Sequence, residues 1–191
     1  MTSLLNLRTF VRTELNEPVA GLWTDALLNG FINQALNELS SRVPPERTQL
    51  ISTTAGVMSY SLAAPMQRVV QVFVNGAELD QSRWAVVNAG AIQTVVLGND
   101  PGTLVSGLKV VGAGFYAALV ADGDVTDLAL ILETALLYFS CYRAILWLAG
   151  RRDVVGLGGD SAVNNYLKLY RTEIKRHQAP ARSARLEYSY E

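Results

Sequence analysis

The sequence has few of the residues on which most enzyme and metal sites depend. It contains one cysteine and one histidine, which excludes an intrachain disulfide, a multi-cysteine zinc site and a zinc site with paired histidines. Cys141 lies in an apolar helical run, where a packed thiol is expected rather than a nucleophile. His177 ends a predicted helix, where an imidazole complements the helix dipole. We therefore predict no catalytic site, no metal and no cofactor, and hence no enzyme.

Charge is also scarce. Only 17% of the residues are charged and the net charge is −1 at pH 7, so no global basic field draws the chain to nucleic acid or to acidic lipid. Half of the residues are hydrophobic, and this surplus suggests surface that is buried against other chains. The opening residues, MTSLLNLRTFVRTELNE, are too polar for a signal peptide, which favours a cytoplasmic origin.

Helical periodicity marks four segments of the chain. The first covers about residues 3–16, and the second follows Thr24, whose side chain can cap it, and ends before Pro44. The third covers residues 128–150, and the fourth runs from Asp160 or Ser161 to about residue 177. The expected apolar stripes of the first, second and fourth helices are Leu4, Leu7, Phe10, Val11 and Leu15; Leu28, Phe31, Ile32, Ala35, Leu36 and Leu39; and Val163, Tyr166, Leu167, Tyr170 and Ile174.

Between the second and third helices the pattern becomes that of strands. From Thr48 to Leu119 the chain is rich in Val, Thr, Tyr and Phe, and turn signals interrupt it. Those signals are Ala55-Gly56, Asn75-Gly76, Asn88-Ala89-Gly90 and 98-GNDPG-102. Short strands at this spacing predict a small antiparallel sandwich or barrel.

The predicted fold is therefore α+β, with a β module inserted into a helical core. Residues 1–47 and 120–178 are expected to form a core like a four-helix bundle, residues 48–119 the inserted module, and residues 179–191 an extended C-terminal arm. An inserted module can project from the core without disturbing it.

The C-terminal arm has the pattern of a binding segment. Pro180 is expected to block continuation of the fourth helix. The alternation in 186-LEYSYE-191 then has the period of a strand with one apolar face, and such a strand gains order by adding to an edge on another chain. Its arginines would pair with acidic groups, and its apolar side chains would supply most of the buried area. The predicted contact residues are Arg182, Arg185, Leu186, Tyr188 and Tyr190.

One alternative is a small nucleotide-dependent enzyme. Gly112-x-Gly114-x-x-Ala117 follows an apparent strand with the spacing of a dinucleotide-binding turn. That motif needs a helix directly after it and then a second parallel strand, whereas here the turn residues 121-ADGD-124 follow within a few positions. The context favours a strand with glycines at a bend or bulge.

A second alternative is a membrane-associated protein. Residues 128–150 are apolar almost all round and long enough to cross a bilayer. Glu133 and Arg143 would each cost a few kcal/mol in hydrocarbon. The pattern favours a helix that is buried on every side, partly by a neighbouring subunit.

A resemblance to a known family rests on the second helix and on the strand pattern after it. The helix opens with Leu-Trp-Thr-Asp and continues as 31-FINQALNEL-39, and 53-TTAGVMSYSLAAPMQRVVQVFVNGAEL-79 and Trp84 follow. These segments resemble the head–tail adaptor (connector, or head-completion) proteins of tailed bacteriophages. The Leu-Pro-Asp step that is common in that family after the tyrosine is here 62-LAAPM-66, which indicates a longer loop.

The resemblance implies a structural protein of the virion neck. It implies a ring of subunits, commonly twelve, that is assembled in the bacterial host beneath the portal and offers a platform to the tail or to a further neck protein. The ring would prolong the channel used in genome packaging and ejection, with DNA passing through it without sequence-specific binding. A C-terminal arm often reaches into the portal in such adaptors, and we expect the β module to meet the next neck or tail component.

Overall fold

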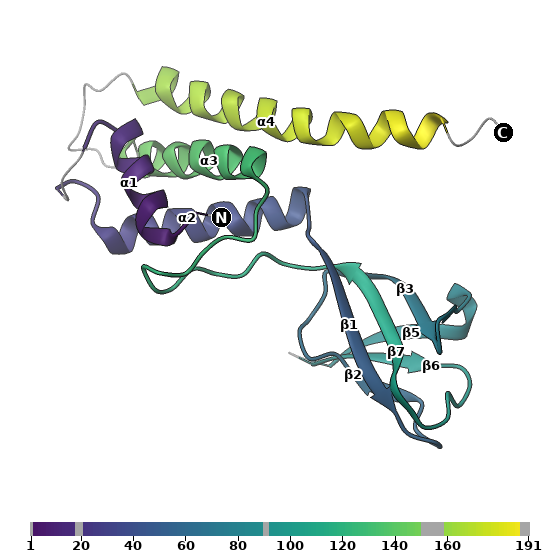
Figure 1. Ribbon diagram of the computed structural model, residues 1–191. Coiled ribbons are helices and arrows are strands. Elements are labelled where there is room, and N and C mark those ends of the chain that lie inside the picture. The colour runs from purple at the N-terminus through teal and green to yellow at the C-terminus, as the bar shows by residue number, and fades with distance from the viewer. Residues whose placement is uncertain (1, 18–20, 90–91, 150–158, 188–191) are drawn as a thin grey trace. The chain divides into compact units, whose positions relative to one another are not determined.

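The computed structural model describes residues 2–17, 21–89, 92–149 and 159–187, and it describes only the backbone of residues 159–162 and 178–187. The chain divides into two compact units. The helical unit comprises Met1–Val43 and Tyr116–Glu191, and the β module comprises Pro44–Phe115 (Figure 1). Helices make up the first unit and antiparallel strands the second, so the predicted α+β class is confirmed.

The described residues of the helical unit form four helices. They are α1 (Leu4–Glu14), α2 (Asp25–Arg42), α3 (Leu130–Ala149) and α4 (Gly159–Glu187). The side-chain oxygens of Ser3 and Thr24 accept the backbone N–H groups of Asn6 and Leu27, each at 3.3 Å, and so cap α1 and α2. The predicted cap at Thr24 is thus confirmed. Within this unit α3 lies between α2 and α4, and it contacts both of them along their length (Figure 1).

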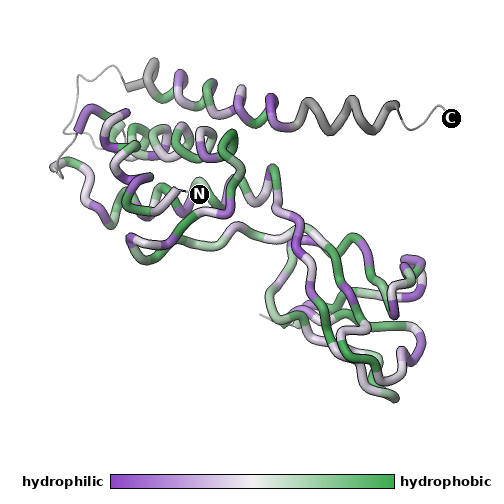
Figure 2. The backbone as a smooth tube through the Cα atoms, in the orientation of Figure 1, coloured by the Kyte–Doolittle hydropathy of each residue, from purple (hydrophilic) through white to green (hydrophobic). Residues whose placement is uncertain are grey.

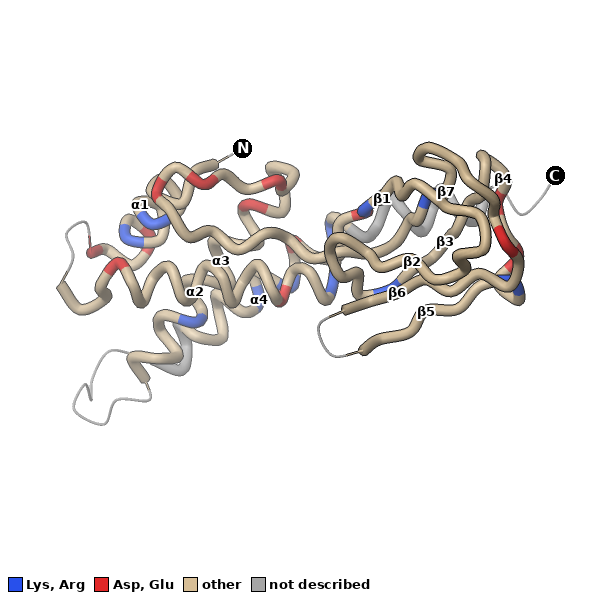
Figure 3. Tube along the Cα trace, turned by 90° about the horizontal axis from the view of Figure 1, so that it is seen from below, with Lys and Arg blue, Asp and Glu red and all other residues tan. Residues whose placement is uncertain are grey.

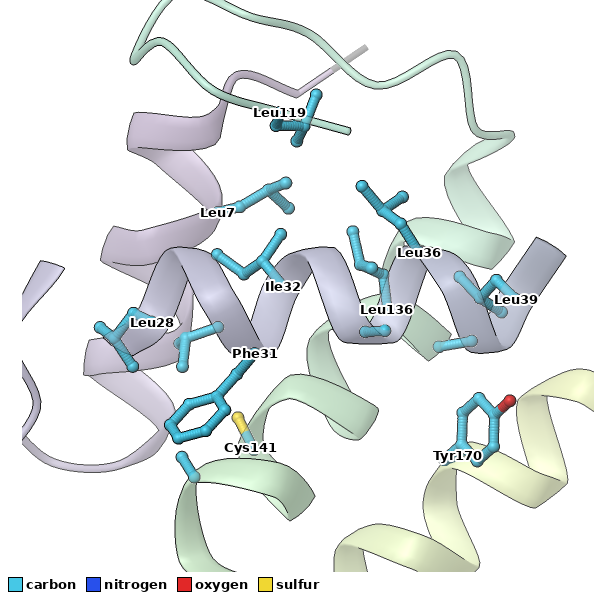
Figure 4. Packing of buried hydrophobic residues seen from close by; sticks show 14 of the residues in the cluster. Leu7, Leu28, Phe31, Ile32, Leu36, Leu39, Leu119, Leu136, Cys141 and Tyr170 are labelled. Atoms are coloured by element: carbon cyan, nitrogen blue, oxygen red, sulfur yellow. The ribbon is translucent and has the colours of Figure 1, made fainter. Parts of the chain in front are cut away.

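One apolar core joins the helices of this unit (Figure 4). All six residues of the predicted α2 stripe are buried, because they recur with the period of the helix and face α1 and α3. Tyr170 and Ile174 bring α4 into the same core, while Tyr166 and Leu167 pack at its margin. The stripe predicted on α2 therefore faces the core, as does the α4 stripe from Tyr166 to Ile174, whereas Val163 is half-buried outside that cluster.

The stripe predicted on α1 needs one correction. Leu4, Leu7 and Val11 are buried, but Phe10 is 51% exposed. Arg8 and Arg12 are each only 7% exposed. Their aliphatic stems lie beside the apolar stripe on the flank of α1 opposite Phe10, so the buried face of the helix is turned away from Phe10.

Helix α3 is the one helix in the described part of the chain that is long and apolar enough to cross a membrane. Length and composition alone do not distinguish such a span from the central helix of a soluble fold. Here α2 and α4 flank it, and its buried residues include Glu133 and Ser140. At the start of α3, Leu130 is 81% exposed, so this chain alone does not cover the helix on every side. The expected cover from a neighbouring subunit stays a prediction.

The β module consists of two antiparallel sheets. The strands are β1 (Glu46–Thr53), β2 (Ser59–Ser61), β3 (Arg68–Val74), β4 (Ala77–Glu78), β5 (Trp84–Ala89), β6 (Ile92–Leu97) and β7 (Leu104–Ala113), with a short 3₁₀ helix, η1 (Gln81–Arg83), before β5. One sheet has the order β1-β7-β3-β4 and the other the order β2-β6-β5. Figure 2 shows apolar stretches along the strands of both sheets.

Alternate residues of the two sheets share a single core, as period-2 burial requires. Val72, Val110 and Leu108 come from one sheet, and Val95 and Leu97 from the other. At the predicted Asn75-Gly76 turn both residues have positive φ, of 50° and 79°, and they join β3 to β4 in a tight hairpin. Residues 90 and 91, in the turn predicted around Asn88-Ala89-Gly90, lie outside the described residues.

The boundaries of the module differ from the predicted residues 48–119. The module begins at Pro44, and residues 116–119 belong to the helical unit. The reason is hydrogen bonding to α2. The N–H of Tyr116 donates to Ser40 Oγ at 2.9 Å, and the side-chain amide of Asn33 pairs with both the N–H and the C=O of Leu119, each at 2.9 Å.

The C-terminal segment also differs from the prediction. Helix α4 continues to Glu187, whereas an extended arm was expected from residue 179. Proline fixes φ near the helical value and costs one backbone hydrogen bond, and the alanines and arginines around Pro180 are good helix formers. Because α4 has 29 residues against 20 in α3, its C-terminal end runs past the start of α3 (Figure 1).

The pairing of Asn33 with Leu119 yields a stability prediction. Asn33→Ala should lower the free energy of unfolding of the helical unit by about 1–3 kcal/mol, because two part-buried backbone groups lose their partner. The measurement is urea unfolding followed by the helical circular dichroism signal. Asn37→Ala is the matched control, because Asn37 is exposed on the same helix. An equal loss in both variants would contradict the role given to Asn33.

Candidate assembly surfaces

The connecting segment, residues 116–129 between β7 and α3, is irregular in backbone but closely bound. Its turn is closed by Asp124, whose carboxylate accepts the N–H groups of Val120 and Ala121 at 2.7 and 2.8 Å. These hydrogen bonds, that from Ala121 foremost, hold the pKa of Asp124 below its ordinary value. The carbonyl of Asp124 accepts from the N–H of Leu4 at 2.9 Å, which ties the turn to the start of α1. These hydrogen bonds therefore hold the backbone of the segment in one conformation at the surface.

Glu133 binds three parts of the helical unit together. Its carboxylate accepts the N–H of Thr2 at 3.0 Å and the hydroxyls of Thr2 and Thr126, each at 2.7 Å. Burial alone would raise the pKa of Glu133, but the hydrogen bonds from Thr126 and Thr2 outweigh it, so the pKa lies below its ordinary value. The first turn of α3, the connecting segment and the N-terminal residues are therefore held by one ionised side chain.

Apolar side chains project from this bound region into solvent. Leu5 and Val125 are 50% and 52% exposed, and Val120 and Leu130 are each 81% exposed. Leu5 and Val125 are close neighbours, because the N–H of Leu5 donates to Asp122 O at 3.3 Å and Val125 forms a β-bridge with Ser3. We call Leu5, Val120, Val125 and Leu130 the junction group. Apolar residues that a well-bonded frame holds outward are typical of a protein contact surface.

A charge network joins α1 to the beginning of α2. Arg12 Nη2 lies 2.7 Å from Asp25 Oδ1 and donates to Trp23 O at 2.8 Å. Arg8 Nη2 lies 2.8 Å from an oxygen of Asp122 in the connecting segment, and Arg8 Nη1 lies 3.6 Å from Asp25. The hydrogen bond from Arg12, with the charge of Arg8, lowers the pKa of Asp25. Figure 3 shows that basic and acidic positions gather around α1.

The network accounts for residues that a sequence alone does not single out. Arg8 and Arg12 are four residues apart beside the apolar stripe of α1, so they lie on one flank of the helix. This spacing is the one sequence signal that could have marked them as buried partners. Asp122, predicted to be a turn former with Asp124, pairs with Arg8, while Asp124 closes the turn.

A groove of about 390 Å³ lies between α2 and α3. Five of its six lining residues have polar or charged side chains, and Arg143 Nε donates to Gln34 Oε1 across it at 2.9 Å. The lining residues are Gln34, Asn37, Glu38, Ser41, Phe139 and Arg143. An open groove with this lining suits polar contacts with another chain rather than a buried apolar ligand.

The glycines of the possible dinucleotide motif serve strand packing. Gly112 lies in β7 between β1 and β3, and a Cβ atom there would come within 2.4 Å of Arg68 O. A Cβ atom at Gly114 would come within 2.2 Å of the side chain of Arg47. Protein atoms occupy the space that a phosphate would need, and β7 leads into the connecting segment rather than a helix. The geometry therefore supports a strand whose glycines let neighbouring segments of the chain approach closely, and not a dinucleotide-binding turn.

Cys141 lies in the core, where burial raises the pKa of its thiol far above the ordinary value, so no thiolate is available for chemistry. Within the described residues, no group of three or more His, Cys, Asp or Glu side chains is placed to hold a metal ion.

Of the predicted contact residues, Arg182, Arg185 and Leu186 lie on the last turns of α4, where the backbone alone is described. Tyr188 and Tyr190 lie outside the described residues.

Comparison with models of protein families gives a match that covers almost the whole chain. The family model described as the SU10 adaptor protein matches residues 2–188, which is almost the whole chain. No curated protein matches the sequence.

The ionised state of Glu133 yields a pH prediction. Because its pKa is lowered in the folded chain from an ordinary 4.5, its stabilisation is full above that value and is lost as the pH falls through the folded-state pKa. We expect Glu133→Gln to cost about 1–3 kcal/mol of unfolding free energy at pH 7, and progressively less as the pH falls below 4.5. The measurement is denaturant unfolding at pH 7 and at a series of acidic pH values.

Glu14→Gln is the control for this experiment, because Glu14 is an exposed acid on α1. A cost of Glu133→Gln that did not change with pH would contradict the role of the ionised carboxylate.

Proposed function

Because the chain belongs to the SU10 adaptor protein family, we propose that it forms a ring at the neck of a phage virion and joins the portal to the tail. Membership confirms the resemblance to phage head–tail adaptors, and it makes the chain a structural adaptor protein of the virion. The finer statement, a ring that is commonly of twelve subunits, rests on the family resemblance and on the surfaces described above. The match over residues 2–188 is the observation that carries the proposal.

The junction group supports contact between neighbouring subunits. Its four side chains are apolar and at least half exposed, although hydrogen bonds fix the backbone that carries them. A second subunit that covered them would gain about 25 cal/mol for each Å² of apolar surface removed from water. A ring requires a contact between two different patches, so the junction group would meet another part of the next helical unit.

The charge of the chain suits a channel through which DNA slides. The 16 Lys and Arg residues are balanced by 17 Asp and Glu, so the chain has no net excess of positive charge to hold DNA phosphates, and binding to DNA would be weak. We propose that DNA passes through the ring without sequence-specific contacts during packaging and ejection. The β module, residues 44–115, would meet the tail or a further neck protein, because it has its own core and is joined to the helices at both ends.

The C-terminal segment, residues 179–191, is proposed as the contact with the portal. The side chains that anchor α4 in the core, Tyr170 and Ile174, precede it. The segment can therefore bind another protein without withdrawing core residues. Arg182 and Arg185 would pair with acidic groups, and Leu186, Tyr188 and Tyr190 would provide the apolar contact.

The ring proposal can be tested through the junction group. Val120→Asp combined with Leu130→Asp should leave the helical unit folded, because both side chains are 81% exposed, and should abolish the ring by burying charge in the contact. The measurement is native mass spectrometry of a co-assembly with the portal, which should show a full ring for the wild type and single subunits for the variant.

The matched control is Val105→Asp, because Val105 is 91% exposed in the β module. Single bound subunits in the saturated wild type, or complete rings in the junction variant, would overturn the proposed ring contact.

The portal contact is tested by truncation after Gln178. The truncated chain should fold, since Tyr170 and Ile174 remain, and its affinity for the portal should fall by at least about a hundredfold, as for loss of a hot-spot cluster. Tyr188→Ala with Tyr190→Ala should reproduce much of this loss. Surface plasmon resonance measures the affinity, and circular dichroism checks the fold. An unchanged affinity after truncation would eliminate the segment as the portal contact.

A further inference from the structure

Strand β5 is an unprotected edge of the β module. It is the outer strand of the sheet β2-β6-β5 and has six residues, 84-WAVVNA-89. None of them is charged and none is proline, although these are the residues with which proteins commonly block edge strands. Figure 3 shows β5 at the side of the module beside β6, with no acidic or basic residue along it.

The other edge strands are shorter or better protected. β2 has three residues and β4 has two, one of which is Glu78. β1 begins with Glu46 and Arg47. Its Gln49 side chain also bridges to the loop after β2, accepting from Ala63 N at 2.8 Å and donating to Ala64 O at 2.6 Å. Among the described edge strands, β5 is thus the one that is six residues long and carries no charge or proline to discourage pairing with a further strand.

The backbone of β5 has hydrogen-bonding groups to offer a further strand. The N–H of Gly98 donates to the C=O of Arg83 at 2.7 Å, which makes these two residues a hydrogen-bonded pair of the β5–β6 ladder. Hydrogen-bonded pairs alternate along an antiparallel ladder. The N–H and C=O groups of Trp84, Val86 and Asn88 therefore point away from β6, and the described residues provide them with no backbone partner.

We propose that β5 pairs antiparallel with β5 of a second copy of this chain, about a two-fold axis at Val86. The N–H of each Val86 then donates to the C=O of the other Val86, and the sheets join into one sheet of order β2-β6-β5-β5-β6-β2. Ala85 lies opposite Val87 of the second copy, a small residue against a larger one. Trp84, whose indole N–H is buried without an acceptor, lies opposite Asn88 of the second copy.

A second copy is the occupant that the charge pattern favours. Like charges that face each other destabilise a strand pair. When a strand pairs with its own copy, each charge on the strand lies near the identical charge of the second copy. β5 carries none, and the exposed residues on its outer side, Ala85 and Val87, are uncharged. This inference goes beyond the proposed ring, because a two-fold contact uses one patch twice and ends at two chains.

The test is a charge swap at Val87, which is 50% exposed. In the proposed pair the two Val87 side chains are diagonal neighbours on one face, so Val87→Lys alone and Val87→Glu alone should each weaken the dimer by about tenfold or more. An equimolar mixture of the two variants should restore dimerisation. Sedimentation equilibrium of the full-length chain, without portal, measures the association, and Val105→Lys is the control that should dimerise like the wild type.

A wild-type chain that stays monomeric at high micromolar concentration would overturn the proposal. So would a dimer that neither single variant weakens, or a mixture that stays as weak as its components. Amide hydrogen exchange on the wild type decides the case in which the variants do not fold. Protection of the Val86 and Asn88 amides should rise with protein concentration, and protection independent of concentration would refute self-pairing.

Discussion

The return of the chain from β7 to α3 is the constraint on which the helical unit depends. The connecting segment lies on a helical core in irregular conformation, where its N–H and C=O groups still need partners. Side chains of α2 supply them, since Asn33 pairs with both backbone groups of Leu119 and Ser40 accepts from Tyr116. Glu133 then fixes the end of the segment through Thr126. With these bonds made, Tyr116, Leu119 and Leu128 complete the core beside α2 and α3.

Local periodicity predicted most of the buried residues of α2, because the residues of one helix face recur at a fixed spacing along the sequence. The α2 stripe from Leu28 to Leu39 and the Asn75-Gly76 hairpin follow from residues within one element. The partner of Asn33 is 86 residues away, so no local pattern connects the two. The family resemblance was likewise recognisable, since it rests on these same fold residues.

Two errors show where single-element rules stop. On α1 the helical period correctly selected Leu4, Leu7 and Val11. It could not show that Arg8 and Arg12 are buried beside them in place of Phe10, because that depends on Asp25 and Asp122, the carboxylates with which these arginines pair. At Pro180 the rule against proline in helices was outweighed by its neighbours. Of the candidate contact residues after it, Leu186, Tyr188 and Tyr190 were chosen by the alternation of a strand, and helix α4 extends past the first of them. The proposed role of these residues therefore rests on composition and position.

The division into two units separates two kinds of contact. The junction group belongs to the helical unit and β5 to the β module, so the same residues are not required for both. Strand pairing between two copies satisfies the outward backbone groups of β5. The joined sheet then ends on both sides at β2, which is too short to pair well with a further strand. A free chain that pairs in this way cannot grow into a filament through β5. Ring assembly would instead depend on a template that arranges the helical units around an axis, and on the proposed function that template is the portal.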